Sequence, residues 1–249
     1  SDYILTEALL RESDRGGQSF FLHNLVSTID GAAERIRGLV PEARIDIAHG
    51  QMRPRELDRV MRDFVDGEID ILVCCAGGDI GAAGTSVGKG GRPENDDCLN
   101  ISLEDYQSVM DRNLLGSILC CREVAPGMIQ RNAGRIITIG SIAGCSGRTY
   151  GAIYSVAKAA LHEYTRCLAD QLRQHNIPVN CVAPGGTVTE RFLRINPIDD
   201  EMMVQQGTLE RYGRPDEVAG VVGFLCTEAS AFISGQVLRV DGGGQTFPC

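Results

Sequence analysis

The apolar segment IDILVCCAGG, residues 69–78, constrains the fold more than any other stretch of this sequence. Its hydrophobic run ends at two glycines, the pattern of a β-strand that is buried on both faces of a parallel sheet. Similar runs alternate with segments of helical periodicity along the chain. Because parallel strands are joined by crossover helices, this alternation predicts an α/β fold: a doubly wound parallel sheet with helices on both faces.

The pattern predicts six strands and five helices. The strands are expected within residues 18–24, 43–50, 69–78, 134–141, 177–185 and 235–243. The helices are expected within residues 28–41, 53–68, 102–131, 150–175 and 214–230. Residues 79–97 are rich in glycine and polar side chains and are expected to form a long loop. Since no segment has the composition of a linker, we expect one Rossmann-like domain over residues 1–249.

Composition and charge exclude several classes of function. The net charge of −9 argues against a nucleic-acid-binding or membrane-binding surface. The charged N-terminal segment differs from a secretory signal. Ten cysteines without a C-x-x-C pair are expected to be buried, reduced thiols, which favours a cytoplasmic protein. The four histidines lack the spacing of metal ligands, so no metal site is expected.

Ser141, Tyr154 and Lys158 are the candidate catalytic residues. Ser141 ends a predicted strand, at the sheet edge where open α/β folds bind ligands. Tyr154 and Lys158 stand four residues apart on a predicted helix and therefore share one face. A neighbouring ammonium is expected to lower the pKa of the phenol, which could then exchange a proton with a substrate oxygen. A serine hydroxyl aimed at the same oxygen would polarise a carbonyl.

A Tyr-x-x-x-Lys pair alone also fits a solvated helix face. Here Asn113 lies in NLLG upstream, and could anchor a water that links Lys158 to solvent. The segments PVNCVAPGGTVTE, GRPDEV and ISGQVLRVDGG follow downstream.

From about residue 70 to 249, these motifs resemble the short-chain dehydrogenase/reductase family. CCAGG is similar to that family's Asn-Asn-Ala-Gly segment, with Cys74 and Cys75 in place of the asparagines. The resemblance implies hydride transfer between NAD or NADP and a small-molecule alcohol or carbonyl. It assigns proton transfer to Tyr154, carbonyl polarisation to Ser141, and tuning of the phenol and ribose binding to Lys158. Asn113 completes the implied catalytic set. The implied cofactor-binding residues are Cys75, Ala76, Gly77, Tyr154, Lys158, Pro184, Gly185, Val188 and Thr189.

Residues 1–74 lack that family's T-G-x-x-x-G-x-G turn, which holds the cofactor pyrophosphate on backbone amides. They instead resemble the second motor domain of the transcription-repair coupling factor, a helicase-type DNA translocase, most specifically in IAHGQM and IDILVC. We therefore expect an engineered chimera, with translocase-derived βα units over residues 1–74 and a reductase-derived part over residues 75–249. In reductase labels the strand order would be 2-1-4-5-6-7.

The missing glycine turn predicts impaired cofactor binding. Ser27 and Thr28 could bind a phosphate or cap the first helix. Arg53 could favour a 2′-phosphate or lie on the surface, so NAD and NADP both stay open.

The sequence leaves two alternatives to a reductase open. One is a catalytically inactive designed chimera, made to test whether fragments of two α/β families can be recombined. The other is residual DNA or nucleoside-triphosphate binding, against which the acidic charge and missing motor motifs count. The loop after CCAGG and residues 189–213 are expected to form the lid and the wall of the substrate site. Small and polar residues there hint at a sugar-like or cyclic polyol substrate. Family resemblance implies a homodimer or homotetramer through residues 102–130 and 151–174, although their apolar stripes could simply face the sheet.

Overall fold

The computed structural model describes residues 33–34, 37–38, 69–82, 91–203 and 207–247. The first two predicted strands and the first two predicted helices lie outside these residues, apart from four helical positions. Within this part, four strands form one sheet in the order β1-β2-β3-β4. They are β1 (Ile71–Cys74), β2 (Arg135–Ile139), β3 (Val179–Pro184) and β4 (Val237–Val240), and all three pairings are parallel.

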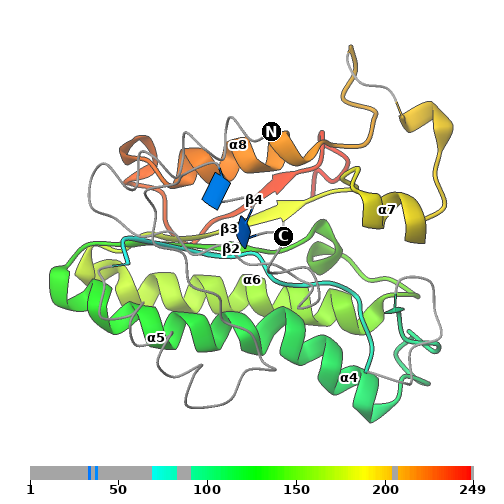
Figure 1. Ribbon diagram of the computed structural model, residues 1–249, viewed down its shortest axis with the longest axis horizontal. Coiled ribbons are helices and arrows are strands. Elements are labelled where there is room, and N and C mark those ends of the chain that lie inside the picture. The colour runs from blue at the N-terminus through cyan, green and yellow to red at the C-terminus, as the bar shows by residue number, and fades with distance from the viewer. Residues whose placement is uncertain (1–32, 35–36, 39–68, 83–90, 204–206, 248–249) are drawn as a thin grey trace.

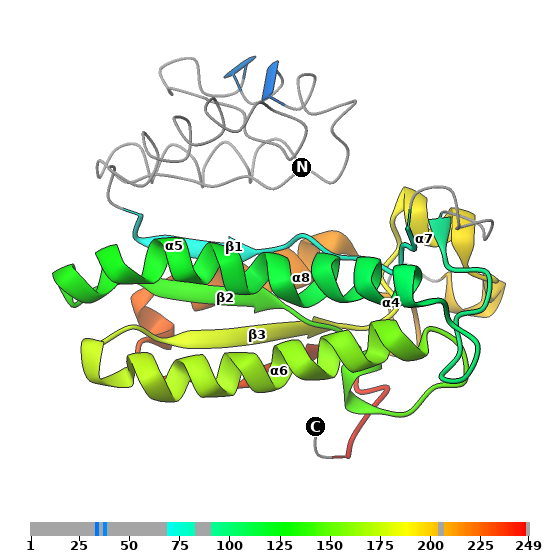
Figure 2. The same ribbon diagram turned by 90° about the horizontal axis from the view of Figure 1, so that it is seen from below.

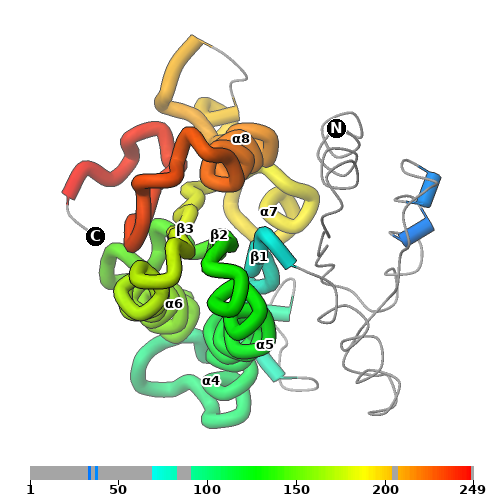
Figure 3. The backbone as a smooth tube through the Cα atoms, turned by 90° about the vertical axis from the view of Figure 1, so that its left-hand side faces the viewer, coloured from blue at the N-terminus to red at the C-terminus, as the bar shows by residue number. Residues whose placement is uncertain are grey.

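Helices cover both faces of this sheet (Figure 1). On one face lie α4 (Leu103–Met110), α5 (Gly116–Arg131) and α6 (Ala152–Leu172), and on the other lies α8 (Pro215–Leu225). Figure 2 shows α5 and α6 running along the sheet. Figure 3 shows the same layers end-on. The doubly wound α/β fold expected from the sequence is confirmed, and the described strands match the 4-5-6-7 part of the predicted order.

Short segments complete the chain path. They are the π-helical η3 (Asp111–Leu115), the 3₁₀ turns η4 (Ile142–Cys145), η5 (Arg173–His175), η6 (Asp200–Met202) and η7 (Glu228–Ser230), and the helix α7 (Glu190–Ile195).

Two apolar clusters hold the layers together. Met128 of α5, Leu172 of α6 and Ile136 of β2 are almost fully buried in the larger cluster, between the sheet and the paired helices. Ile137 and Val182 point to the opposite face and pack against Leu225 of α8. Adjacent residues of β2 thus serve opposite faces, as the alternation of side chains along a strand requires.

The segment 102–131 was expected to be one regular helix, and the structure corrects this. Ser102 does cap its start, with its side chain accepting a hydrogen bond from the Asp105 N–H. After Met110 the helix widens into η3, before α5 continues to Arg131. A π-helical turn of this kind rotates the side chains that follow, and here it contains the buried Asn113.

Candidate active site

The four predicted catalytic residues lie at the carboxyl edge of the sheet. Ser141 follows β2, with its side chain accepting from the Ala143 N–H at 3.1 Å. Tyr154 and Lys158 lie in the first two turns of α6, and Asn113 lies in η3. The chain fold therefore brings together residues from three separate elements.

Lys158 is buried, with 3% of its surface exposed, and its ammonium donates to the Ile139 carbonyl at 2.8 Å. Burial lowers the pKa of Lys158 to about 8 because desolvation disfavours the charged form. Its Nζ lies 5.7 Å from the centroid of the Tyr154 ring. A Cβ added to Gly77 would lie 3.0 Å from this Nζ, so only glycine lets the backbone approach so closely.

The pKa of Tyr154 was expected to be lowered by Lys158, and the structure corrects this. Burial raises the pKa of the phenol, and the charge of Asp79 raises it further. A hydrogen bond with the Ser141 side chain and the charges of Arg148 and Arg92 act in the opposite direction. Desolvation therefore dominates, and Tyr154 stays protonated at neutral pH.

Asn113 is fully buried and contacts the loop after β1. Its Oδ1 accepts from the Gly78 N–H at 2.9 Å, while its Nδ2 donates to the Gly78 carbonyl at 2.9 Å and to the Val109 carbonyl at 2.8 Å. Both ends of the amide are thus bonded to backbone. Asn113 therefore holds the backbone of the loop after β1 in place. Its expected role in binding a water that links Lys158 to solvent stays a prediction.

The predicted cofactor-binding residues form two groups. Cys75, Ala76 and Gly77 follow β1 on the loop that Asn113 holds. Pro184 ends β3, and the Gly185 N–H bonds to the Val240 carbonyl. The Thr189 side chain caps α7 through the Phe192 N–H, and the Val188 N–H bonds to the Gly213 carbonyl at 2.9 Å. The Val188 N–H therefore already has a hydrogen-bond acceptor within the protein.

An acid pair that the sequence analysis missed lies beside Tyr154. Asp79 and Asp96 are each only 9% exposed, and their carboxyl groups lie close enough to interact. Among the described residues, the buried Oδ1 atom of each has no hydrogen-bond partner. Burial, and then the contact with Asp79, raise the pKa of Asp96 to about 7. Arg92 pairs with Asp79 at 3.3 Å. The Asp96 carbonyl accepts from the Gly151 N–H at the start of α6, which ties this pair to the helix of Tyr154.

His162 is the second residue missed. It lies four residues after Lys158 on α6, is 2% exposed, and its Nε2 is 3.4 Å from the Ser141 nitrogen. The repeated spacing of four through Tyr154, Lys158 and His162 could have placed it on the same helix face.

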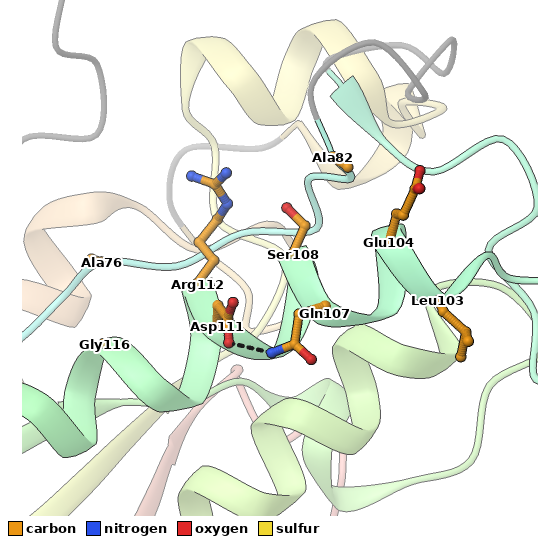
Figure 4. Close-up of a pocket in the computed structure, with 9 residues that line it drawn as sticks. All are labelled: Ala76, Ala82, Leu103, Glu104, Gln107, Ser108, Asp111, Arg112 and Gly116. Carbon is orange, nitrogen blue, oxygen red and sulfur yellow. Dashed lines mark hydrogen bonds between the residues drawn. The ribbon is translucent and has the colours of Figure 1, made fainter. Parts of the chain in front are cut away.

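A pocket of about 1070 Å³ lies next to this edge (Figure 4). It runs along α4 and η3 under the loop after β1, and Arg112 rises beside that loop in the figure. Its lining residues are Ala76, Ala82, Leu103, Glu104, Gln107, Ser108, Asp111, Arg112 and Gly116.

The cysteines depart in part from the expected buried thiols. Eight are free, but Cys75, Cys98 and Cys167 are exposed. Cys145 is disulfide-bonded, and its partner is not among the described residues. The cysteines were predicted to be buried because several of them lie in apolar segments. Whether a cysteine is exposed also depends on which face of its helix or strand it occupies, and a local apolar segment does not determine that.

In the described ranges, no three His, Cys, Asp or Glu side chains are arranged to hold a metal ion. The helices of that same part of the chain include none with the length and apolar character needed to cross a membrane.

The chain is similar to proteins named as reductases and to one named as a dehydrogenase. A family model described as enoyl-(acyl carrier protein) reductase matches residues 23–245. The chain is 43% identical over 146 residues to a 3-oxoacyl-[acyl-carrier-protein] reductase of Synechocystis, covering 58% of each protein. It is 37% identical over 180 residues to a cyclohexanol dehydrogenase of Rhodococcus, covering 71% of this chain and 63% of that protein. The chain thus spans about three fifths of the length of these two relatives.

A solved structure shares the fold. It is a 3-oxoacyl-[acyl-carrier protein] reductase from Brucella melitensis with bound NAD, 26% identical, with a TM-score of 0.69 over 88% of this chain and 78% of the other.

Proposed function

Because this chain belongs to the short-chain dehydrogenase/reductase family, we propose that it transfers a hydride between NAD or NADP and a small alcohol or carbonyl compound. The observation that carries this proposal is the contact of Tyr154 with Ser141, beside the buried ammonium of Lys158. Two similar proteins named for carbonyl reduction and alcohol oxidation add support.

The bound nicotinamide would supply or accept the hydride, and the chain's own residues handle the proton. Tyr154, whose pKa is raised, carries the proton that a reduced carbonyl oxygen needs. Ser141 shares a hydrogen bond with this phenol, so both hydroxyls can converge on one substrate oxygen. Lys158 brings a positive charge to within 5.7 Å of the ring centroid. The hydrogen bond with Ser141 and the charges of Arg148 and Arg92 favour the phenolate left after proton transfer.

The described residues fit the nicotinamide half of such a cofactor. The Lys158 ammonium has three N–H donors, and it approaches the Gly77 backbone so closely that a Cβ would lie 3.0 Å away. We propose that this Lys158 binds the ribose hydroxyls, with Cys75, Ala76 and Gly77 on one side of the cofactor. Pro184, Gly185, Val188 and Thr189 would line the other side, Val188 through its side chain because its N–H is engaged.

The origin of residues 1–74 belongs to the same proposal. We propose translocase-derived βα units there, joined to the reductase part, with weakened cofactor binding because the glycine turn is missing. This proposal rests on the sequence resemblance of residues 1–74 and on their lack of the T-G-x-x-x-G-x-G turn. The family model counts against it, because that match begins at residue 23.

We further propose a homodimer or homotetramer in the cytoplasm. The paired helices expose Leu115 (41%), Leu119 (46%) and Val156 (49%), which supports contact with a second copy along this face. Eight free cysteines fit a reducing compartment, while the disulfide at Cys145 does not.

Two measurements test the proposed function. Oxidation of NADH and NADPH is followed with a β-ketoacyl thioester and with cyclohexanone, and each cofactor is titrated against the protein by calorimetry. We expect turnover with at least one pair, at a cofactor dissociation constant that falls when T-G-x-x-x-G-x-G replaces the native first turn. If no binding is found at millimolar cofactor, the protein is instead an inactive scaffold. A salt-dependent shift with DNA would favour the translocase function.

A further inference from the structure

His162 fills a space directly beneath the Ser141 backbone. Its imidazole is 2% exposed, and the Ser141 N–H points at Nε2 with the two nitrogens 3.4 Å apart. The next peptide groups form η4, in which the Gly144 N–H bonds to the Ser141 carbonyl at 3.0 Å. His162 therefore contacts Ser141, which with Gly140 joins the end of β2 to this turn.

Two glycines make room for the imidazole. A Cβ added to Gly140 would collide with His162 Nε2, and one added to Gly144 would lie 2.8 Å from His162 Cε1. Real Cβ atoms do not approach other atoms so closely, so the backbone on either side of Ser141 is packed tightly against this side chain. The same glycines also lie close to Cys181 Sγ, at Gly140, and to the Ala159 nitrogen, at Gly144. The ring and the loop fit each other closely enough that removing the ring would leave a cavity under Ser141.

The electrostatics keep this histidine neutral. Burial, together with the positive charges of Arg166 and Lys158, lowers the pKa of His162 to about 4. A neutral imidazole carries one proton, and a ring whose Nε2 accepts must carry it on Nδ1. The Ser141 N–H therefore meets an acceptor throughout the neutral pH range.

We propose that His162 is a positioning residue that holds the Ser141 backbone so that the serine hydroxyl meets Tyr154 and the substrate oxygen. This role rests on the proposed function. His162 touches neither substrate nor cofactor in this account, and it acts only through Ser141. Replacing His162 with a residue that cannot accept a hydrogen bond would let the backbone at Ser141 shift. Shifts of about 1 Å at a reacting group can lower the rate on the order of 100-fold.

The first test is spectroscopic and needs no turnover. Long-range ¹H–¹⁵N correlation spectra of the whole chain at pH 7 report which nitrogen of each histidine is protonated, with His162→Gln assigning the signals. We expect an unprotonated Nε2 on His162. We also expect the Ser141 amide to shift in His162→Leu, to return toward wild type in His162→Gln, whose Oε1 can accept, and to stay unchanged in His175→Leu.

The second test is kinetic. With saturating cofactor, His162→Leu should lower kcat about 10- to 100-fold with little change in KM for the cofactor, while His162→Gln recovers most of the loss and His175→Leu loses none. A protonated Nε2, an unmoved Ser141 amide, or a leucine variant within about twofold of wild type overturns the proposal. If the wild-type chain turns over no substrate, the proposed function fails, and the spectra alone decide the role of His162.

Discussion

Asn113 bonds both backbone groups of Gly78, accepting from its N–H and donating to its carbonyl at 2.9 Å each. These two residues are 35 positions apart in the chain, and the contact fixes the loop after β1 to the π-helical turn η3. The loop carries the residues proposed to meet the cofactor. Its start is therefore held by a buried amide, while Ile80, Gly81 and Ala82 further along make hydrogen bonds to other segments.

Asn113→Ala should destabilise the fold markedly. The change leaves the Gly78 N–H, the Gly78 carbonyl and the Val109 carbonyl without their partner. A buried polar group that loses its hydrogen bond costs about 1–3 kcal/mol, so we expect a loss of about 2–4 kcal/mol in urea unfolding. Asn100→Ala, which alters an exposed amide bonded to Asp97, is the matched control. Equal losses in the two variants would contradict the support role of Asn113.

Gly77→Ala should impair catalysis more than stability. The new Cβ would lie 2.9 Å from Asn113 Oδ1 and 3.0 Å from Lys158 Nζ. Because the Lys158 side chain is flexible at its end, we expect the ammonium to move, with kcat falling about tenfold or more. Gly220→Ala on α8, where nothing lies within 4 Å of the added atom, should leave kcat unchanged and stabilise the helix slightly. An unchanged kcat in Gly77→Ala would show that the position of Nζ is unimportant.

Lys158 should make stability rise with pH above about 8. Its pKa is about 8 in the fold, below the ordinary 10.5. Between these values the unfolded chain binds the proton and the folded chain does not, so unfolding becomes less favourable as pH increases. Below pH 8 Lys158 is protonated in both the folded and the unfolded chain, so burial of its charge lowers the free energy of unfolding by the full amount.

Cysteine thiols also titrate in this pH range, so the pH dependence caused by Lys158 is obtained by comparing wild type with Lys158→Met. The free energy of unfolding of wild type, relative to the variant, should increase by on the order of 2–3 kcal/mol from pH 7 to pH 10.5. A difference that is constant across this range would mean that Lys158 is not desolvated.

Asp96 should give the opposite slope at lower pH. Its pKa is raised to about 7 by burial and by Asp79, so the fold binds a proton that the unfolded chain releases near pH 4. Stability from this group is therefore fully present below pH 4 and is lost as pH rises to 7. Asp96→Asn should flatten the decline measured by thermal unfolding. Asp97→Asn, at a half-buried neighbour whose pKa is lowered by hydrogen bonds from Asn100 and Leu99, should retain it.

Much of the described fold could be predicted from the sequence. The strands β1 to β4 each coincide with an expected apolar run, because strands buried on both faces tolerate little but apolar side chains. Ser102 could be recognised as the start of α4, since capping is a local effect.

Other features depend on contacts that no local pattern encodes. The π-helical turn at η3 is associated with the bonds of Asn113 to Gly78, 35 residues away. The raised pKa of Tyr154 follows from burial beneath segments distant in the chain, whereas the spacing to Lys158 alone suggested a lowered one. The Asp79–Asp96 pair and the His162–Ser141 contact also join separate segments. Strand end and helix spacing already suggested Ser141, Tyr154 and Lys158, and family resemblance completed the set with Asn113.

The most direct test of the central claim is the rate of reduced-cofactor oxidation in Tyr154→Phe. The variant keeps the ring beneath which Lys158 lies and removes only the hydroxyl bonded to Ser141. The account predicts that kcat falls at least about 100-fold at an unchanged cofactor dissociation constant, as expected when a proton donor is lost. A phenylalanine variant that oxidises the cofactor at the wild-type rate would contradict it.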